Sequence, residues 1–197
     1  AAVCLTANPD YRTPYTRFGL SVERIEPGDS AALEAVVESA GGVVLALEAG
    51  AGGEPVLVRR PWCRVAALFL EPVQGEGGIR PLDRAFLARV REVADLAGVP
   101  VVVDEIQSGM GRCGAFAASA WLGLRGDYYT FGKSLAGGIA KVSAMLVDRE
   151  RYVPDFGIFH TSTFAEDDPG AVVGRRALEI LERDQLPMRA AARGAAL

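Results

Sequence analysis

The sequence has few of the residues that build metal centres, disulfide scaffolds or nucleic-acid interfaces. It holds three cysteines without paired spacing and one histidine, His160, so it carries neither a zinc motif nor a disulfide framework. Its formal net charge of −4 gives no basic footprint for nucleic acid. No segment approaches the roughly 20 consecutive apolar residues that a membrane-spanning helix needs. We therefore expect no metal site, no nucleic-acid partner and no membrane span.

The cysteines and the first residues also bear on location. Cys4, Cys63 and Cys113 have the distribution of unpaired thiols in a reducing compartment. The opening segment, AAVCLTANPDYR, lacks the basic and apolar regions of a signal peptide. We therefore expect a cytoplasmic protein.

Lysine is scarce as well. Of the 21 Lys and Arg residues, two are lysines, Lys133 and Lys141. Arginine cannot form an imine with an aldehyde, because it has no primary amine that can lose its proton. A lysine on a glycine-flanked turn, such as Lys133, is therefore a mild sign of special chemistry.

The clearest fold pattern lies in the middle of the chain. Val65–Leu70 and Val99–Val103 are short apolar runs typical of buried strands, and 82–97 has the apolar face of a helix that Gly98 ends. A strand, a helix and a strand with short links form a βαβ unit with parallel strands. The pattern therefore predicts that Glu71 and Asp104 emerge at the same edge of a sheet.

Other elements complete the prediction. A helix is expected from Asp29 or Ser30 to the Gly41-Gly42 pair, and another over Ala171–Leu181. Residues 49–62 are expected to be a loop, and the tail after Pro187 is expected to fray. Strands are predicted at Ala2–Thr6, Ser21–Ile25, Val43–Glu48, Tyr128–Phe131 and Val142–Val147, with the last antiparallel to its neighbour. The predicted fold class is α/β, with a mostly parallel sheet flanked by helices.

Candidate functional residues follow two of these strands. Asp104 ends the first, and Lys133 follows the second between Gly132 and Ser134. Ligands of open α/β sheets bind outside the carboxyl ends of the strands. A lysine that bonds to an aldehyde and a carboxylate that keeps a pyridine nitrogen protonated are what a pyridoxal 5′-phosphate site needs. The sequence therefore predicts this cofactor.

Four motifs strengthen that prediction, and they occur in the order and at roughly the intervals seen in class III aminotransferases. They are EPVQGEGG from Glu71, DEIQSGMGRCG from Asp104, FGKSLAGG from Phe131 and HTSTF from His160. The chain resembles this family of fold type I pyridoxal-phosphate enzymes. The resemblance implies that residues 1–197 are a partial large, cofactor-binding domain, without the upstream phosphate-loop segment and the downstream small domain. We therefore expect weak or no turnover from the isolated chain.

The resemblance implies roles for four residues near the cofactor ring. Lys133 would form the Schiff base, and its freed amine would then move a proton between substrate and cofactor. Asp104 would pair with the pyridine nitrogen, Ile106 would pack against the ring, and Gln107 would donate to the phenolic oxygen. Without the resemblance, Lys133 could be a solvated loop lysine, Asp104 a helix-capping acid and Ile106 a core residue. Lys141 is the other candidate for the imine-forming lysine.

Three further residues take roles from the same resemblance. Glu71 would hold Gln107 or the active-site loop in place. Glu76 resembles a gate glutamate whose arginine partner is not in this sequence, and otherwise is an exposed loop acid. Thr163 would reach across a homodimer to the partner's cofactor phosphate, and otherwise is a turn residue.

The implied reaction is transfer of an amino group from an amino donor to a keto or aldehyde acceptor, by a ping-pong mechanism through Lys133. The same framework also supports racemases, aminomutases and decarboxylases. A third possibility is a cofactor-free structural or interaction module.

Overall fold

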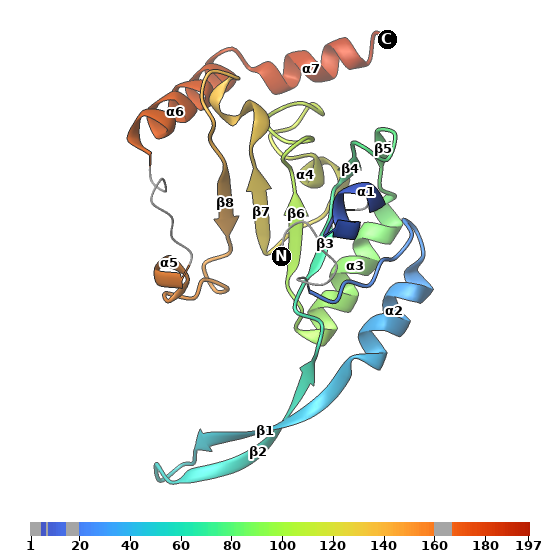
Figure 1. Ribbon diagram of the computed structural model, residues 1–197, viewed down its shortest axis with the longest axis vertical. Coiled ribbons are helices and arrows are strands. Elements are labelled where there is room, and N and C mark those ends of the chain that lie inside the picture. Colours follow the sequence, from blue (N-terminus) through green and yellow to red (C-terminus); the bar gives the residue numbers. More distant parts are fainter. Residues whose placement is uncertain (1–4, 7, 15–19, 160–166) are drawn as a thin grey trace.

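A four-stranded sheet forms the centre of the computed structural model, which describes residues 5–6, 8–14, 20–159 and 167–197. The strand order is β3 (Leu68–Leu70), β6 (Val101–Asp104), β7 (Tyr128–Phe131) and β8 (Ala144–Val147) (Figure 1). The first three strands are parallel, and β8 is antiparallel to β7. The predicted α/β class with a mostly parallel sheet is therefore confirmed, and so is the antiparallel last strand.

Helix α3 (Arg84–Ala97) connects β3 to β6 and covers one face of the sheet. It begins where the Asp83 carboxylate accepts hydrogen bonds from the backbone N–H groups of Ala85 (2.8 Å) and Phe86 (3.2 Å). It ends at Gly98, whose φ of 68° lies in the left-handed region that favours glycine. The apolar face of α3 and the alternate residues of β6 form the main core, with Leu87, Val90, Val93, Ala94, Val101 and Val103 all buried.

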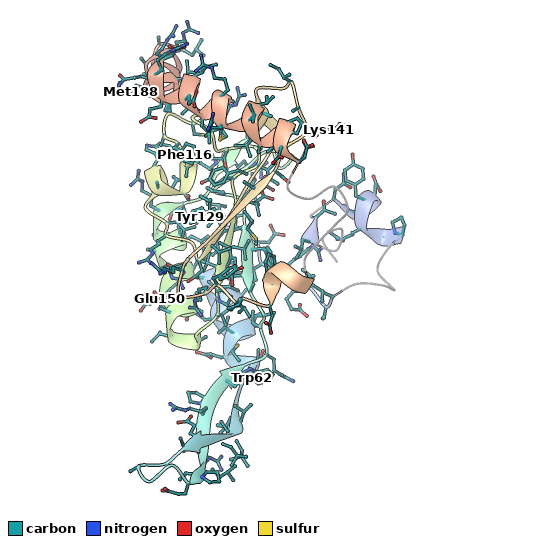
Figure 2. The ribbon with its side chains drawn as sticks, turned by 90° about the vertical axis from the view of Figure 1, so that its left-hand side faces the viewer. Trp62, Phe116, Tyr129, Lys141, Glu150 and Met188 are labelled. Carbon is teal, nitrogen blue, oxygen red and sulfur yellow. The ribbon has the colours of Figure 1, made fainter. Side chains whose placement is uncertain are left out.

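The other helices surround this unit. Helix α2 (Ser30–Ser39), capped by Asp29, adds Leu33 and Val37 to the main core. Helix α5 (Phe156–Phe159) lies on the opposite side of the sheet from α3 (Figure 2). The remaining helices are α1 (Pro9–Arg12), α4 (Ala118–Leu122), the 3₁₀ helix η3 (Lys133–Ala136), α6 (Asp168–Arg183) and α7 (Leu186–Gly194). Every helix of the described residues is too short or too polar to cross a lipid bilayer.

Two hairpins lie outside the central sheet. A short one pairs β4 (Val73–Gln74) with β5 (Arg80–Pro81). A long one pairs β1 (Gly41–Ala49) with β2 (Pro55–Cys63) in antiparallel register over all nine residues, and it projects from the body of the molecule (Figure 1).

Several sequence predictions are wrong in the structure. Residues 21–25 form no strand, and the segment expected to be a loop contains β2. Proline usually interrupts a strand, but Pro55 and Pro61 sit on an edge strand, where proline is tolerated. The tail forms α7, because alanine and arginine favour helix. Of the predicted strand over residues 2–6, residues 2–4 lie outside the described residues, and residues 5 and 6 are not in a strand.

Candidate functional site

The carboxyl ends of three parallel strands bring the candidate residues to one edge of the sheet. Leu70 of β3 pairs with Val103 of β6, and Asp104 pairs with Thr130 of β7. The backbone N–H of Glu105 donates to the Thr130 carbonyl (3.0 Å), so the pairing of β6 with β7 extends beyond the strand. Glu71 directly follows β3, Asp104 ends β6, and Lys133 follows β7 after Gly132, so all three leave the sheet at its carboxyl edge.

Asp104 is the last residue of β6, and its half-buried carboxylate has a fixed position. One oxygen, Oδ1, accepts a hydrogen bond from the backbone N–H of Ile106 (2.9 Å), two residues further along the chain. Asp side chains favour such local turns, because they replace a backbone acceptor. The turn holds the carboxylate at the sheet edge and sets the direction in which the chain leaves β6.

Lys133 occupies an unusual backbone conformation. Its φ of 46° lies in the left-handed region, which costs a residue with a Cβ atom roughly 1–2 kcal/mol. The conformation is held on its carboxyl side by Leu135 and Ala136, which are buried in the core, and by the bond from the Leu135 N–H to the Gly132 carbonyl (3.0 Å). The Lys133 side chain itself is exposed. Strain of this kind at a defined turn often marks a functional site.

The loops after β6 and β7 contact each other. Gly132 is buried, and a Cβ atom placed on it would lie 3.6–3.7 Å from the side chain of Ile106. This is ordinary van der Waals contact distance, so Ile106 lies against the residue that precedes Lys133. The contact links the Asp104 turn to the Lys133 turn.

A third loop joins them through Gly75. Its N–H donates to Oε2 of Glu71 (3.2 Å), and the side-chain amide of Gln107 packs so closely on it that a Cβ atom would overlap the amide oxygen. A larger residue at position 75 would therefore require the Gln107 amide, the end of an exposed and flexible side chain, to move. The structure thus brings Glu71, Gly75 and Gln107 together, and the role of Glu71 in supporting an active-site loop stays a prediction.

Two of the predicted residues are not joined to this cluster. Glu76 is exposed in the loop between β4 and β5, as its alternative interpretation had it. Thr163 lies outside the described residues. Both stay predictions with respect to function.

Sequence reasoning missed the role of Glu105, whose side chain is fully buried. Oε1 accepts from the Ser119 N–H (2.8 Å) and hydroxyl (2.6 Å), and Oε2 accepts from the Ser108 hydroxyl (2.6 Å) and the Ala118 N–H (3.1 Å). One carboxylate thus fixes both ends of the loop between β6 and α4. The available signal was an acid directly after a buried strand, but two of its three partners, Ala118 and Ser119, lie 13 and 14 residues further along the chain.

An ionic cluster around Asp127 lies at the other ends of β6 and β7, where these strands begin. Asp127 precedes β7, and its carboxylate binds the Arg91 guanidinium (2.8 Å), the Val101 N–H (2.7 Å) and Arg151 (3.2 Å). Burial acts to raise the pKa of Asp127, but the hydrogen bonds from Arg91 and Val101, together with the positive charges of Arg91 and Arg151, outweigh it and bring the pKa below its usual value. The cluster ties α3, β6 and β7 together.

Neither the Cys113 thiol nor the pocket beside α6 and α7 adds a reactive group to the carboxyl edge of the sheet. Burial, together with the charge of Glu105, raises the pKa of the Cys113 thiol, so the thiol stays protonated. A pocket of about 410 Å³ lies between Phe116 and helices α6 and α7, and no candidate site residue lines it. The described residues contain no group of three or more His, Cys, Asp or Glu side chains that could hold a metal ion.

The carboxyl edge of this α/β sheet carries an acid, an amide and a strained lysine, which is the set of groups expected in a pyridoxal-phosphate enzyme. Comparisons with known proteins identify the family. The model of class III aminotransferases matches residues 56–197. The chain therefore belongs to the class III aminotransferase family, and its fold is that of the fold type I pyridoxal-phosphate enzymes. The resemblance inferred from the four motifs is confirmed.

Individual relatives support this assignment. The chain is 42% identical to acetylornithine aminotransferase of Synechocystis over 131 residues, which are 66% of this chain and 30% of that protein. It is 30% identical to ornithine aminotransferase 2 of Staphylococcus saprophyticus over 96% of this chain and 42% of that protein. The crystal structure of ornithine aminotransferase from Toxoplasma gondii matches with a TM-score of 0.76 and 28% identity, covering 96% of this chain and 40% of that one. The chain thus spans about two fifths or less of the length of these relatives.

Proposed function

We propose that the protein to which this chain belongs is a pyridoxal-phosphate-dependent aminotransferase, and that residues 1–197 supply the central part of its cofactor-binding domain. The observation that carries the proposal is the arrangement at the carboxyl edge, where Asp104 and Lys133 follow adjacent parallel strands and Ile106 joins their turns. The coverage of the relatives supports the domain assignment.

The residues at this edge fit the cofactor. Lys133 provides a primary amine on an exposed, strained turn, and Asp104 provides a carboxylate fixed by the Ile106 N–H. Gly75 leaves room for the Gln107 amide, which a larger residue at that position would displace. When bound, pyridoxal phosphate supplies an electron sink that stabilises negative charge at the substrate α-carbon.

Each residue then has a defined task. Lys133 would hold the cofactor through its Nζ amine, and the same amine would be the base that removes the proton from the substrate α-carbon. Asp104 would keep the pyridine nitrogen protonated, because a nearby carboxylate favours the charged form. Gln107 would donate a hydrogen bond to the phenolic oxygen, and Ile106 would present an apolar surface to the ring. Glu71 keeps the Gly75 loop against Gln107.

We propose that the whole protein is a homodimer in which Thr163 reaches the partner's cofactor phosphate, and that Glu76 acts as a gate in the substrate pocket. A cytoplasmic location is proposed from the unpaired thiols, since Cys63 and Cys113 are free. Ornithine and acetylornithine are the amino donors to test first, because related enzymes are named for them.

Trapping of the cofactor tests the proposal. Pyridoxal phosphate is added to the chain, borohydride is added to fix any adduct, and the labelled peptide is identified by mass spectrometry. We expect the label on Lys133 and its loss in Lys133→Ala. Lys141→Ala is the matched control, since it removes the other lysine and should label normally. Label on Lys141, or none on the parent chain, would contradict the proposal and favour a cofactor-free module.

A second step separates the reaction types. An amino donor alone should convert bound cofactor to its pyridoxamine form if the protein is a transaminase. A racemase or decarboxylase acting on the same donor would leave the cofactor in its aldehyde form. The step is performed on the full-length protein, because the chain covers only part of its relatives.

A further inference from the structure

The hairpin formed by β1 and β2 exposes an unusual amount of apolar surface. Val43, Leu45, Leu47 and Leu57 are 54%, 61%, 72% and 61% exposed. Their register pairs place all four on one face of the ribbon, because residues two apart share a face and Leu47 pairs with Leu57. An isolated two-stranded hairpin is only marginally stable in water, so a partner that covers this surface or adds a strand would stabilise it.

The two edges of the hairpin differ in their ability to accept another strand. The Gly50 N–H bonds to the Glu54 carbonyl (2.7 Å), and hydrogen-bonded and non-bonded pairs alternate from there. The odd-numbered residues of both strands therefore point their backbone groups outward. On β2 two of these residues are Pro55 and Pro61, which have no N–H to donate. On β1 none of them is proline, so its outer edge is open along its whole length.

Charge separates the edges further. Next to Pro61, β2 carries Arg59 and Arg60, whereas β1 has a single charged residue, Glu48. The Glu48 carboxylate is already neutralised by Arg60, at 2.5 and 2.6 Å. Natural sheets protect their edges with prolines and charges, and a long apolar edge without them pairs readily with another strand.

We propose that β1 pairs with β1 of a second copy of this chain, antiparallel and about a two-fold axis at Leu45. Full overlap of the nine residues puts Leu45 opposite Leu45, Val43 opposite Leu47 and Glu48 opposite Gly42. No like charges then face each other, and the outward backbone groups of the odd-numbered residues bond to one another. The two hairpins form a four-stranded sheet with a continuous apolar face. Such self-complementary contact is what two-fold symmetry requires.

This contact is separate from any dimer contact through Thr163. It is tested by measuring the oligomeric state of the full chain in solution. Sedimentation velocity is measured over a range of concentrations for the parent, Leu45→Lys and Leu57→Lys. The two leucines are equally exposed on the same face, but only Leu45 lies on the open edge. Leu45→Lys places two lysines opposite each other and should weaken the association about tenfold or more. Leu57→Lys should sediment as the parent does.

Amide exchange provides a second readout that does not depend on substitutions. Raising the protein concentration should slow exchange at Val43, Leu45 and Leu47, and should leave Leu57 and Arg59 unchanged. A parent chain that stays monomeric, a Leu45→Lys variant that associates like the parent, or equal loss in both variants would overturn the proposal.

Discussion

Strands β6 and β1 are built from similar aliphatic residues, yet they end in opposite environments. In β6, Val101 and Val103 are fully buried under α3, and the strand has a neighbour on each side. In β1, every residue from Gly41 to Leu45 is exposed, and the strand has one neighbour. Parallel strands joined by crossover helices acquire a cover as they form, whereas a hairpin does not. The way in which a strand is connected therefore decides its burial here, and the candidate site lies at the carboxyl ends of the buried strands.

The largest expected effect comes from the carboxylate that ends the buried region. Glu105→Ala removes the acceptor of several buried donors and should lower the free energy of unfolding by about 3–5 kcal/mol. Glu150→Ala, in an exposed turn, is the control and should change it little. Urea denaturation measures both variants. Equal effects would show that the Glu105 network does not stabilise the loop.

Truncation of one leucine in each region compares them directly. Leu87 is 1% exposed and Leu47 is 72% exposed. Leu87→Ala should cost about 2–5 kcal/mol, because it leaves a cavity in the core. Leu47→Ala should change the free energy of unfolding by about 0.5 kcal/mol or less in dilute solution. A large loss for Leu47→Ala would mean that the hairpin face is covered within the monomer.

Acid should weaken the anchored strands through Asp127. Its pKa is lowered in the folded state, so its stabilising contribution is complete above the unfolded pKa of about 4 and is lost as the pH falls through the folded value. Asp127→Asn should cost about 1–3 kcal/mol at neutral pH. The variant should also lose less stability than the parent between neutral and acidic pH. Thermal denaturation over a pH series checks the slope, and parallel curves would contradict it.

Substitution of Gly75 should affect stability less than the changes at Glu105 and Leu87, and it should affect the site more. Gly75→Ala forces the Gln107 amide to move and should cost about 1 kcal/mol of stability. Affinity for pyridoxal phosphate should fall several-fold, since the 71–78 loop and Gln107 shift together. Gly42→Ala, where a Cβ atom would meet nothing within 4 Å, is the control for binding. Unchanged affinity in Gly75→Ala would separate this loop from the cofactor.

Local patterns made much of the fold predictable. Helix α3 was predicted from its apolar period and Gly98, and β7 was predicted with its observed bounds. Strand β2 was missed because Pro55 reads as the end of a strand unless it is known to lie on an edge strand, where its missing N–H needs no partner. The observed strand before Glu71 is shorter than the predicted Val65–Leu70, since only Leu68–Leu70 pair with β6.

The candidate site was predictable in its residues but not in its supports. The order of the motifs identified Asp104 and Lys133, and the βαβ pattern placed Glu71 at the same edge. The left-handed backbone of Lys133 and the packing of Gln107 on Gly75 depend on tertiary contacts. The partners of Glu105 likewise come from a loop and a helix start whose positions only the folded chain defines.

The central claim is that Asp104 and Lys133 serve one bound cofactor, and a single titration tests it. Pyridoxal phosphate is titrated into the parent, Asp104→Asn and the exposed control Asp155→Asn, while formation of the Lys133 adduct is followed by absorbance. The account predicts that Asp104→Asn raises the half-saturating concentration about tenfold or more, because it removes the charge that holds the pyridine proton. Asp155→Asn should match the parent. Equal half-saturation in all three proteins would contradict the account.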